Sequence, residues 1–221
     1  MSVGWIVGTR KVVTLRPNER SRVIGLAMKR LLDVAFSVVG LAAAIPILAA
    51  AALVIKLGSQ GPVLYRSVRV GKKGRHFTCY KLRTMVADAE VRKQDLRGRN
   101  QRQGAFFKIA ADPRITRVGR WLRRFSLDEL PQLWNVLRGE MSLVGPRPHP
   151  LDDCEKYELD DWRRLTMTPG LTGLWQVTAR CDPSFARSMA LDLEYISTWS
   201  LWTDFIILCK TIPAVLSGSG A

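Results

Sequence analysis

Residues 31–55 read LLDVAFSVVGLAAAIPILAAAALVI, an apolar stretch whose single charged residue, Asp33, lies near its edge. About 20 apolar residues are enough for a helix to cross a bilayer, so a transmembrane anchor is one interpretation. A secretory signal peptide is a second, but the run is too long for a typical signal and follows a substantial basic stretch. The stretch therefore predicts a helix embedded in a membrane.

Basic residues flank this stretch on both sides. Residues 1–30 contain seven Lys and Arg against one acid, Glu19, and residues 56–83 contain eight and no acid. Lys and Arg mark the cytoplasmic side of membrane segments, and here both flanks carry that mark. A segment that enters and leaves the bilayer by the same face resolves the conflict.

Pro46 supplies a bend near the middle of the stretch, because proline removes a helix hydrogen bond and clashes with the preceding turn. Leu31 to Ile45 makes roughly 22 Å of helix, which falls short of the roughly 30 Å hydrocarbon core. These lengths favour a re-entrant helix–break–helix over a spanning one. A kinked spanning helix stays open as the alternative.

The whole chain is strongly basic, with 34 Lys and Arg against 19 Asp and Glu among 221 residues, a net charge of +15. Such a surface favours an anionic partner, whether nucleic acid, anionic lipid or a phosphorylated substrate. The four cysteines are far apart and the chain has two histidines, so neither a zinc site nor a disulfide framework is indicated.

Outside the apolar stretch the pattern is mixed. Residues 63–86 contain two strand-like pieces separated by Gly71-Lys72-Lys73-Gly74, which predicts a hairpin. Residues 114–140 and 184–216 have helical patterns. The aromatics Trp199, Trp202 and Phe205 fit either a helix at a lipid interface or ordinary core packing, and both interpretations stay open.

Residues 112–148, DPRITRVGRWLRRFSLDELPQLWNVLRGEMSLVGPRP, combine three features. The first is a cluster of arginines, whose guanidinium forks match phosphate oxygens. A solvated basic face or a contact with lipid headgroups is the alternative, so the cluster alone is weak evidence. They are Arg114, Arg117, Arg120, Arg123 and Arg124.

The second feature is Ser126-Leu127-Asp128-Glu129-Leu130-Pro131. Ser126 with Glu129 fits a capping box, and Asp128 as the N-cap would put Pro131 at a tolerated position. Local sequence favours a cap over a catalyst at Asp128. The third feature is Gly145-Pro146-Arg147-Pro148, in which prolines restrict where the arginine points, as a phosphate clamp requires and as an ordinary loop also allows.

Together these residues resemble the monotopic phosphoglycosyl transferases, bacterial enzymes that act on polyprenyl phosphates. The resemblance covers nearly everything from residue 29 onward. It rests on KRLLD (29–33), GPVLYRSVRVGKKGRHF (61–77), YKLRTM (80–85), the 112–148 stretch, PGLTGLWQVTAR (169–180) and residues 192–221. One departure is Ser67, where the family pattern leads us to expect glutamine.

The resemblance implies a mostly helical α/β fold in three parts. These are a basic leader over residues 1–28, a re-entrant membrane hairpin over 29–57 broken at Pro46, and a cytoplasmic catalytic domain with amphipathic interfacial helices over 58–221. It implies a monotopic protein on the cytoplasmic face of the bacterial inner membrane.

The same resemblance implies a chemistry. Asp128 would attack the β-phosphate of a UDP-sugar, release UMP and pass a hexose 1-phosphate, of glucose or galactose, to undecaprenyl phosphate, which is the first membrane step of exopolysaccharide, O-antigen or capsule synthesis. Glu129 would orient the site, and Mg²⁺ would bind at Asp128. The implied phosphate- or substrate-binding residues are Arg123, Arg147, Pro146, Pro148, Lys81, Arg83 and Gln132.

Two other functions stay open on sequence grounds. One is an inactive membrane-tethered scaffold for a polysaccharide assembly complex. The other is a binder of anionic surfaces driven by the +15 charge, whose affinity would fall steeply with salt. We expect the lipid of the inner membrane as a partner, no nucleic acid, and a homodimer as one assembly the chain could form.

Overall fold

The computed structural model describes residues 19–96, 109, 112–180, 182 and 184–218. Most of the predicted leader, residues 1–18, lies outside the described residues. The one helix among them that is long and apolar enough to cross a membrane is α1 (Glu19–Gly58). The membrane segment was predicted to begin at residue 29, but the helix begins ten residues earlier, at Glu19.

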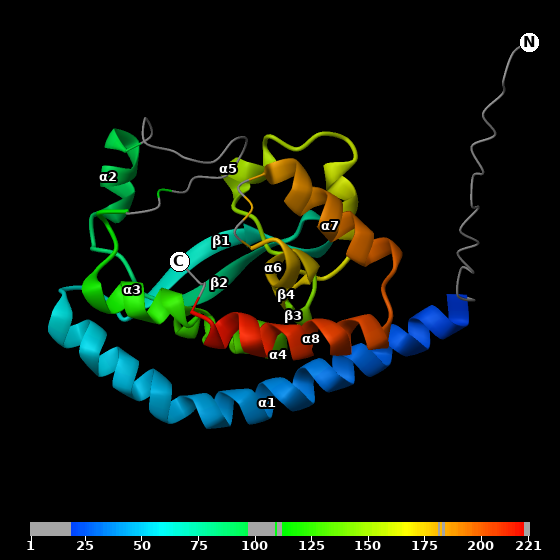
Figure 1. The fold of residues 1–221 in the computed structure, drawn as a ribbon, viewed down its shortest axis with the longest axis horizontal. Helices are drawn as coiled ribbons and strands as arrows, with labels where there is room; N and C mark the ends of the chain where they lie inside the picture. The colour runs from blue at the N-terminus through cyan, green and yellow to red at the C-terminus, as the bar shows by residue number, and fades with distance from the viewer. Residues whose placement is uncertain (1–18, 97–108, 110–111, 181, 183, 219–221) are drawn as a thin grey trace, which may run out of the picture.

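The predicted break at Pro46 is wrong, since α1 continues through this residue. Figure 1 shows α1 as a single curved helix whose concave side faces the rest of the molecule. A proline inside a helix removes one hydrogen bond and crowds one turn, which bends a helix without ending it when the neighbouring turns are otherwise good helix. Here the residues around Pro46 are Ala, Ile and Leu, which continue the helix easily.

The two faces of α1 differ sharply in polarity. Its outer face exposes large apolar side chains along the whole length, among them Val23, Leu31, Phe36, Val39, Ile45, Leu53 and Leu57. Its inner face buries Lys29, Asp33, Ser37, Ala44, Ala51 and Ile55. An exposed apolar surface of this length is typical of contact with lipid.

Polar side chains on the inner face fasten the first half of α1 to the domain. The Lys29 ammonium lies 2.6 Å from a carboxylate oxygen of Asp204, and both side chains are buried. Arg30 donates to the carbonyls of Val136 and Leu137 at the end of α4 (Gln132–Arg138). The Asp33 carboxylate accepts a hydrogen bond from the backbone N–H of Leu143.

Two small sheets form the centre of the domain. Strand β1 (Leu64–Val70) pairs antiparallel with β2 (His76–Leu82) through the short helical turn η1 (Lys72–Gly74), which confirms the predicted hairpin. Strand β3 (Ser142–Val144) pairs in parallel with β4 (Gly170–Thr172). Outside these two small sheets, most of the described chain is helical, as expected.

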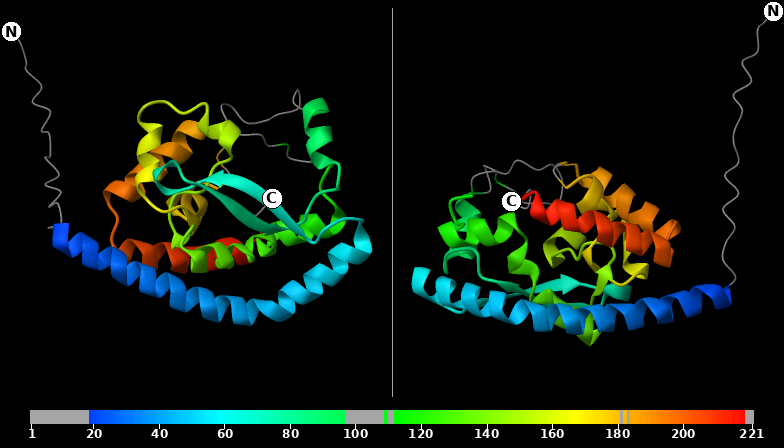
Figure 2. Two further views of the ribbon diagram at one scale, coloured as in Figure 1. Left: turned by 180° about the vertical axis from the view of Figure 1, so that it is seen from behind. Right: turned by 60° about the horizontal axis from the view of Figure 1, so that its bottom comes forward.

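The remaining helices surround these sheets (Figure 2). They are α2 (Ala89–Asp95), α3 (Arg117–Arg124), η3 (Leu127–Glu129), α5 (Leu151–Cys154), η4 (Asp161–Thr166), α6 (Leu174–Thr178), α7 (Phe185–Ser197) and α8 (Leu201–Leu216). The predicted helical region 184–216 is therefore two helices. Figure 1 shows α3, α4 and α8 in a layer next to α1.

The aromatic residues Trp199, Trp202 and Phe205 differ in burial. Trp199 packs with the buried cluster around Val144 and Tyr195, and its indole N–H donates to Asp204. Trp202 and Phe205 are 67% and 53% exposed and stack on each other on α8. Core packing thus explains Trp199, whereas the exposed pair has the position expected of interfacial aromatics.

Asn135 joins helix α4 to the edge of β2. Its fully buried side chain accepts from the Tyr80 N–H and donates to the Thr78 carbonyl and to Glu140. The side-chain amide thereby takes the place of a neighbouring strand and satisfies two backbone groups of β2.

We expect Asn135→Ala to lower the free energy of unfolding by about 2–4 kcal/mol, because two buried backbone groups of β2 lose their partners. Thermal unfolding of the detergent-solubilised protein checks this. The matched control is Arg138→Ala on the same helix, whose exposed ion pair with Glu140 should be worth little. Equal effects of the two substitutions would contradict the assignment.

Candidate active site

The residues Asp128 and Glu129, called the acidic pair below, lie on the short helix η3 between α3 and α4. Ser126, which precedes η3, has a left-handed backbone (φ 55°) and makes no side-chain cap. Pro131 is the N-cap of α4, so neither Ser126 nor Asp128 caps that helix. The capping interpretation favoured by local sequence is therefore wrong, and Asp128 is buried without that structural role.

Glu129 is bound by two cations from different parts of the chain. Its Oε1 lies 2.6 Å from the Lys81 ammonium of β2 and 2.6 Å from the Arg147 guanidinium in the loop after β3. All three side chains are largely buried. These ion pairs join the hairpin, η3 and the Arg147 loop at one point.

Asp128 differs from its neighbour Glu129 in its bonding partners. Among the described residues, no side chain or backbone group forms a hydrogen bond or ion pair with its carboxylate. Burial raises the pKa of Asp128, the charge of Lys81 lowers it, and the charge of Glu129 raises it further; the net direction is upward. Asp128 is thus a buried carboxylate that makes no hydrogen bond or ion pair with the residues that the structure describes.

At Glu129 the same two cations outweigh the effect of burial. Burial alone would raise the pKa of this carboxyl, but the charges and hydrogen bonds of Arg147 and Lys81 hold it well below its ordinary value. In turn the charge of Glu129 raises the pKa of Arg147. Two adjacent carboxylates with pKa values pushed apart are a pattern typical of functional sites.

The predicted arginine cluster divides into different roles. Arg123 donates from Nε to the Thr84 hydroxyl, and although burial lowers its pKa, the charges of Asp128 and Asp112 favour its charged form. Arg114 instead forms a buried ion pair with Asp112 and also donates to the Ala89 carbonyl. Arg117, Arg120 and Arg124 are exposed. Of the cluster, Arg123 is the member that the structure brings to the acidic pair.

The Pro146-Arg147-Pro148 loop is held by its backbone. The Gly170 N–H donates to the Pro146 carbonyl, and Arg69 donates to the Pro148 carbonyl. Arg164, fully buried, donates to the Arg147 carbonyl at 2.7 Å and to the Asp192 carboxylate. Pro146 and Pro148 are both buried, so the loop is fixed by packing and hydrogen bonds as well as by proline rigidity.

Two of the residues predicted to bind substrate, Arg83 and Gln132, have surroundings that differ from those of Lys81 and Arg147. Arg83 is buried and donates to the carbonyls of Ser59 and Gln60 just beyond α1, so the structure gives it a role in fixing the end of that helix. Gln132, 3% exposed on the first turn of α4, has an amide nitrogen with no hydrogen-bond partner among the described residues. Its place next to η3 keeps it a candidate for substrate contact.

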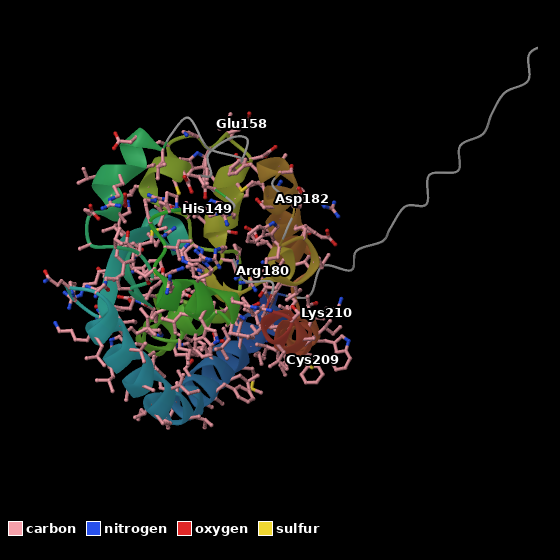
Figure 3. The ribbon with its side chains drawn as sticks, turned by 60° about the vertical axis from the view of Figure 1, so that its left-hand side comes forward. His149, Glu158, Arg180, Asp182, Cys209 and Lys210 are labelled. Atoms are coloured by element: carbon pink, nitrogen blue, oxygen red, sulfur yellow. The ribbon has the colours of Figure 1, made fainter. Side chains whose placement is uncertain are left out.

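Arg180, which the sequence analysis did not single out, contacts the residue that precedes η3. Its guanidinium donates to the Ser126 hydroxyl at 3.0 Å, two residues before Asp128. Figure 3 shows Arg180 near the centre of the molecule, whereas Cys209 and Lys210 of α8 lie at the edge. The PGLTGLWQVTAR stretch contained the signal, because it ends in this arginine.

To a magnesium ion, Asp128 would offer a carboxylate that makes no hydrogen bond or ion pair with the described residues. Among the described residues no group of three or more His, Cys, Asp or Glu lies together in a way that could hold a metal. Mg²⁺ commonly binds through one or two carboxylates and completes its shell with substrate phosphates and water. The residues therefore fit an ion that binds together with a phosphorylated substrate.

The sequence of the chain matches that of known proteins. A galactosyl transferase, CpsE, of Streptococcus agalactiae serotype III is 45% identical over 198 residues, which cover 89% of this chain and 44% of that protein. The exopolysaccharide production protein ExoY of Sinorhizobium fredii is 41% identical over 204 residues, which cover 90% of each chain. A UDP-glucose:undecaprenyl-phosphate glucose-1-phosphate transferase of Caulobacter vibrioides is 42% identical, over 96% of this chain and 78% of that protein.

The chain thus spans less than half of the length of CpsE but nine-tenths of ExoY. A family described as bacterial sugar transferase matches residues 24–218, a range that contains nearly all of α1, the acidic pair and the Arg147 loop. Since this match covers most of the chain, the protein belongs to the bacterial sugar transferase family.

Proposed function

We propose that the protein transfers a hexose 1-phosphate from a UDP-sugar to undecaprenyl phosphate, with Asp128 as the nucleophile. The observation that carries the proposal is the contrast within the acidic pair: Glu129 is held by Lys81 and Arg147, while the Asp128 carboxylate has no bonding partner among the described residues. A buried carboxylate without partners is costly, and proteins keep such groups chiefly at functional sites.

The reaction has two displacements at one phosphorus atom. In the first, an Asp128 oxygen bonds to the β-phosphorus of the donor, the bond from that phosphorus to the bridging oxygen breaks, and UMP leaves. In the second, a phosphate oxygen of undecaprenyl phosphate attacks the same phosphorus and the bond to Asp128 breaks. The products are a diphosphate-linked sugar and the regenerated carboxylate.

The cations around the acidic pair neutralise the phosphates. Arg123, Lys81 and Arg147 surround Asp128 closely enough to act on its pKa, and phosphoryl transfer depends on such positioning and charge neutralisation. Glu129 acts as a positioning residue, since it fixes the orientation of Lys81 and Arg147. Mg²⁺ bound by Asp128 and the diphosphate would add further neutralisation of the developing charge.

The names of the relatives support the substrates. They include proteins named for galactose and for glucose transfer to undecaprenyl phosphate, and one named for exopolysaccharide production. We therefore propose glucose or galactose as the sugar and exopolysaccharide synthesis, or that of O-antigen or capsule, as the pathway. An inactive scaffold is less favoured, because a scaffold gains nothing from a buried Asp128 that has no partner among the described residues.

The geometry of α1 supports a re-entrant arrangement at the cytoplasmic face of the bacterial inner membrane. Lys29 and Asp33 in its first half and Ala51 and Ile55 in its second half all bury against the same domain. If α1 crossed the bilayer, one half of this charged domain would lie inside hydrocarbon, where charges are costly. A curved helix that dips into one leaflet with its exposed apolar face avoids that cost.

We expect Asp128→Asn to reduce UMP release by at least about a thousandfold, since the nucleophile is lost. The assay uses protein in nanodiscs with Mg²⁺, undecaprenyl phosphate and a panel of UDP-sugars. The control is Asp160→Asn at an exposed carboxylate, which should leave the rate unchanged. UMP release by the Asp128 variant at the wild-type rate would show that the nucleophile is another residue.

The same substitution should raise the melting temperature at neutral pH. Because the folded-state pKa of Asp128 is raised, its ionisation costs stability, and this cost appears as the pH rises through that pKa. Asparagine is never ionised and avoids it. An inactive variant with an equal or higher melting temperature has lost chemistry and not folding.

The first displacement should slow as the pH falls through the raised pKa of Asp128, because the protonated carboxyl is not a nucleophile. The rate constant of UMP formation at low donor concentration, without acceptor, is the measurement. Its acid limb should lie above the ordinary aspartate value of about 3.9. Glu129 does not produce this limb, since its pKa is held below the ordinary range. A limb at or below 3.9 would contradict the geometry.

Topology is tested by cysteine labelling in a background without native cysteines. In the variants Ser21→Cys, before the apolar stretch, and Arg75→Cys, after it, both sites are exposed, and both should react only from the cytoplasmic side. Labelling of either one by a membrane-impermeant reagent added from the periplasm would show that α1 spans the membrane.

A further inference from the structure

A cavity of about 290 Å³ lies between the first turns of α1 and the domain. It is separate from the acidic pair, because Lys72, which lines it, belongs to the hairpin turn, whereas Lys81 lies near the far end of β2, roughly 15–20 Å along the strand. The side chains and backbone that line it belong to Arg22, Leu26, Lys29, Arg30, Asp33, Lys72, Gly139, Met141, Ser142, Thr166, Met167 and Thr168.

The lining carries an excess of positive charge, with four basic residues and one acid, Asp33. Lys29 is paired with Asp204, and Arg30 is bound to the carbonyls at the end of α4. Arg22 and Lys72 are exposed, and neither of their side chains makes a hydrogen bond or an ion pair with the described residues. The cavity thus presents two available cations, one from α1 and one from the hairpin turn.

Nothing in the sequence of residues 1–18 would neutralise these cations. That segment contains Arg10, Lys11 and Arg16 and no acidic residue. The charge of the cavity therefore favours an anion supplied from outside the chain.

Apolar surface adjoins the cavity on the same turns of α1. Val23, Ile24, Met28, Leu31 and Leu32 are exposed there. Gly25 packs closely against Trp199, which precedes the α8 turn bearing the exposed pair Trp202 and Phe205. Cations in a cavity beside an exposed apolar face suit a ligand with an anionic head and apolar chains.

We propose that this cavity binds the phosphate headgroup of an anionic phospholipid, with Arg22 and Lys72 as its ligands. The acyl chains lie along the exposed apolar face of the first turns of α1. A bound lipid would hold the amino-terminal half of α1 at the depth of the headgroups, and it links the hairpin turn to the membrane surface. This site is independent of the transfer reaction proposed above.

The test titrates the detergent-solubilised full chain with dihexanoyl phosphatidylglycerol and counts bound lipid by native mass spectrometry. We expect saturable binding of one lipid that weakens about tenfold or more in the double variant Arg22→Gln/Lys72→Gln, since two lipid-facing charges are lost. The matched control is Arg66→Gln/Lys210→Gln, which removes the same charge from exposed positions outside the cavity.

Three outcomes would overturn the proposal. Equal weakening in both double variants would mean that only net charge attracts the lipid. Equal binding of dihexanoyl phosphatidylcholine would mean that the cations do not select the headgroup. Inorganic phosphate that competes at the same concentration as the lipid would mean that the site recognises free phosphate. All substituted side chains are exposed, and unchanged melting temperatures of the variants confirm that they fold.

Discussion

The ion pairs from Lys81 and Arg147 to Glu129 are the interaction on which the rest of the site depends. They bring together the hairpin, the loop after β3 and the short helix η3, three segments separated along the chain by up to 66 residues, from Lys81 to Arg147. Because both cations pair with Glu129, its neighbour Asp128 is buried near positive charges and makes no hydrogen bond or ion pair with the described residues. This arrangement suits the proposed role of Asp128 toward a phosphorylated ligand.

The second constraint is the attachment of a membrane helix to a charged domain. Hydrophobic burial cannot orient α1 by itself, because its outer face is more apolar than its inner face. The orientation comes from Lys29, Arg30 and Asp33, whose partners lie on α8, α4 and β3. Removing any of these partners would leave a buried charge unpaired, which costs far more than the pair contributes.

These two constraints place the proposed reaction and the proposed lipid site at different ends of the β1–β2 hairpin. The acidic pair lies near the end of β2, and the cavity at the hairpin turn lies beside the first turns of α1. A donor that is soluble in water and an acceptor that is soluble in lipid must meet at the membrane surface. A domain fastened along the whole concave side of α1 is held at that surface from both ends.

The sequence by itself determined the long apolar helix, the hairpin and the family, because apolar length, turn residues and motif order are local properties. The resemblance also pointed to Asp128, Glu129, Arg123 and Arg147 as site residues, and their roles stay a prediction. It was wrong about two backbone conformations. Pro46 bends α1 without breaking it, and the left-handed backbone of Ser126 abolishes the expected cap. Only the tertiary structure showed that Glu129 takes both cations and that Arg180 reaches Ser126. The pKa of a carboxyl and the partner of an arginine depend on which distant charges folding brings within a few ångströms, and no local pattern contains that distance.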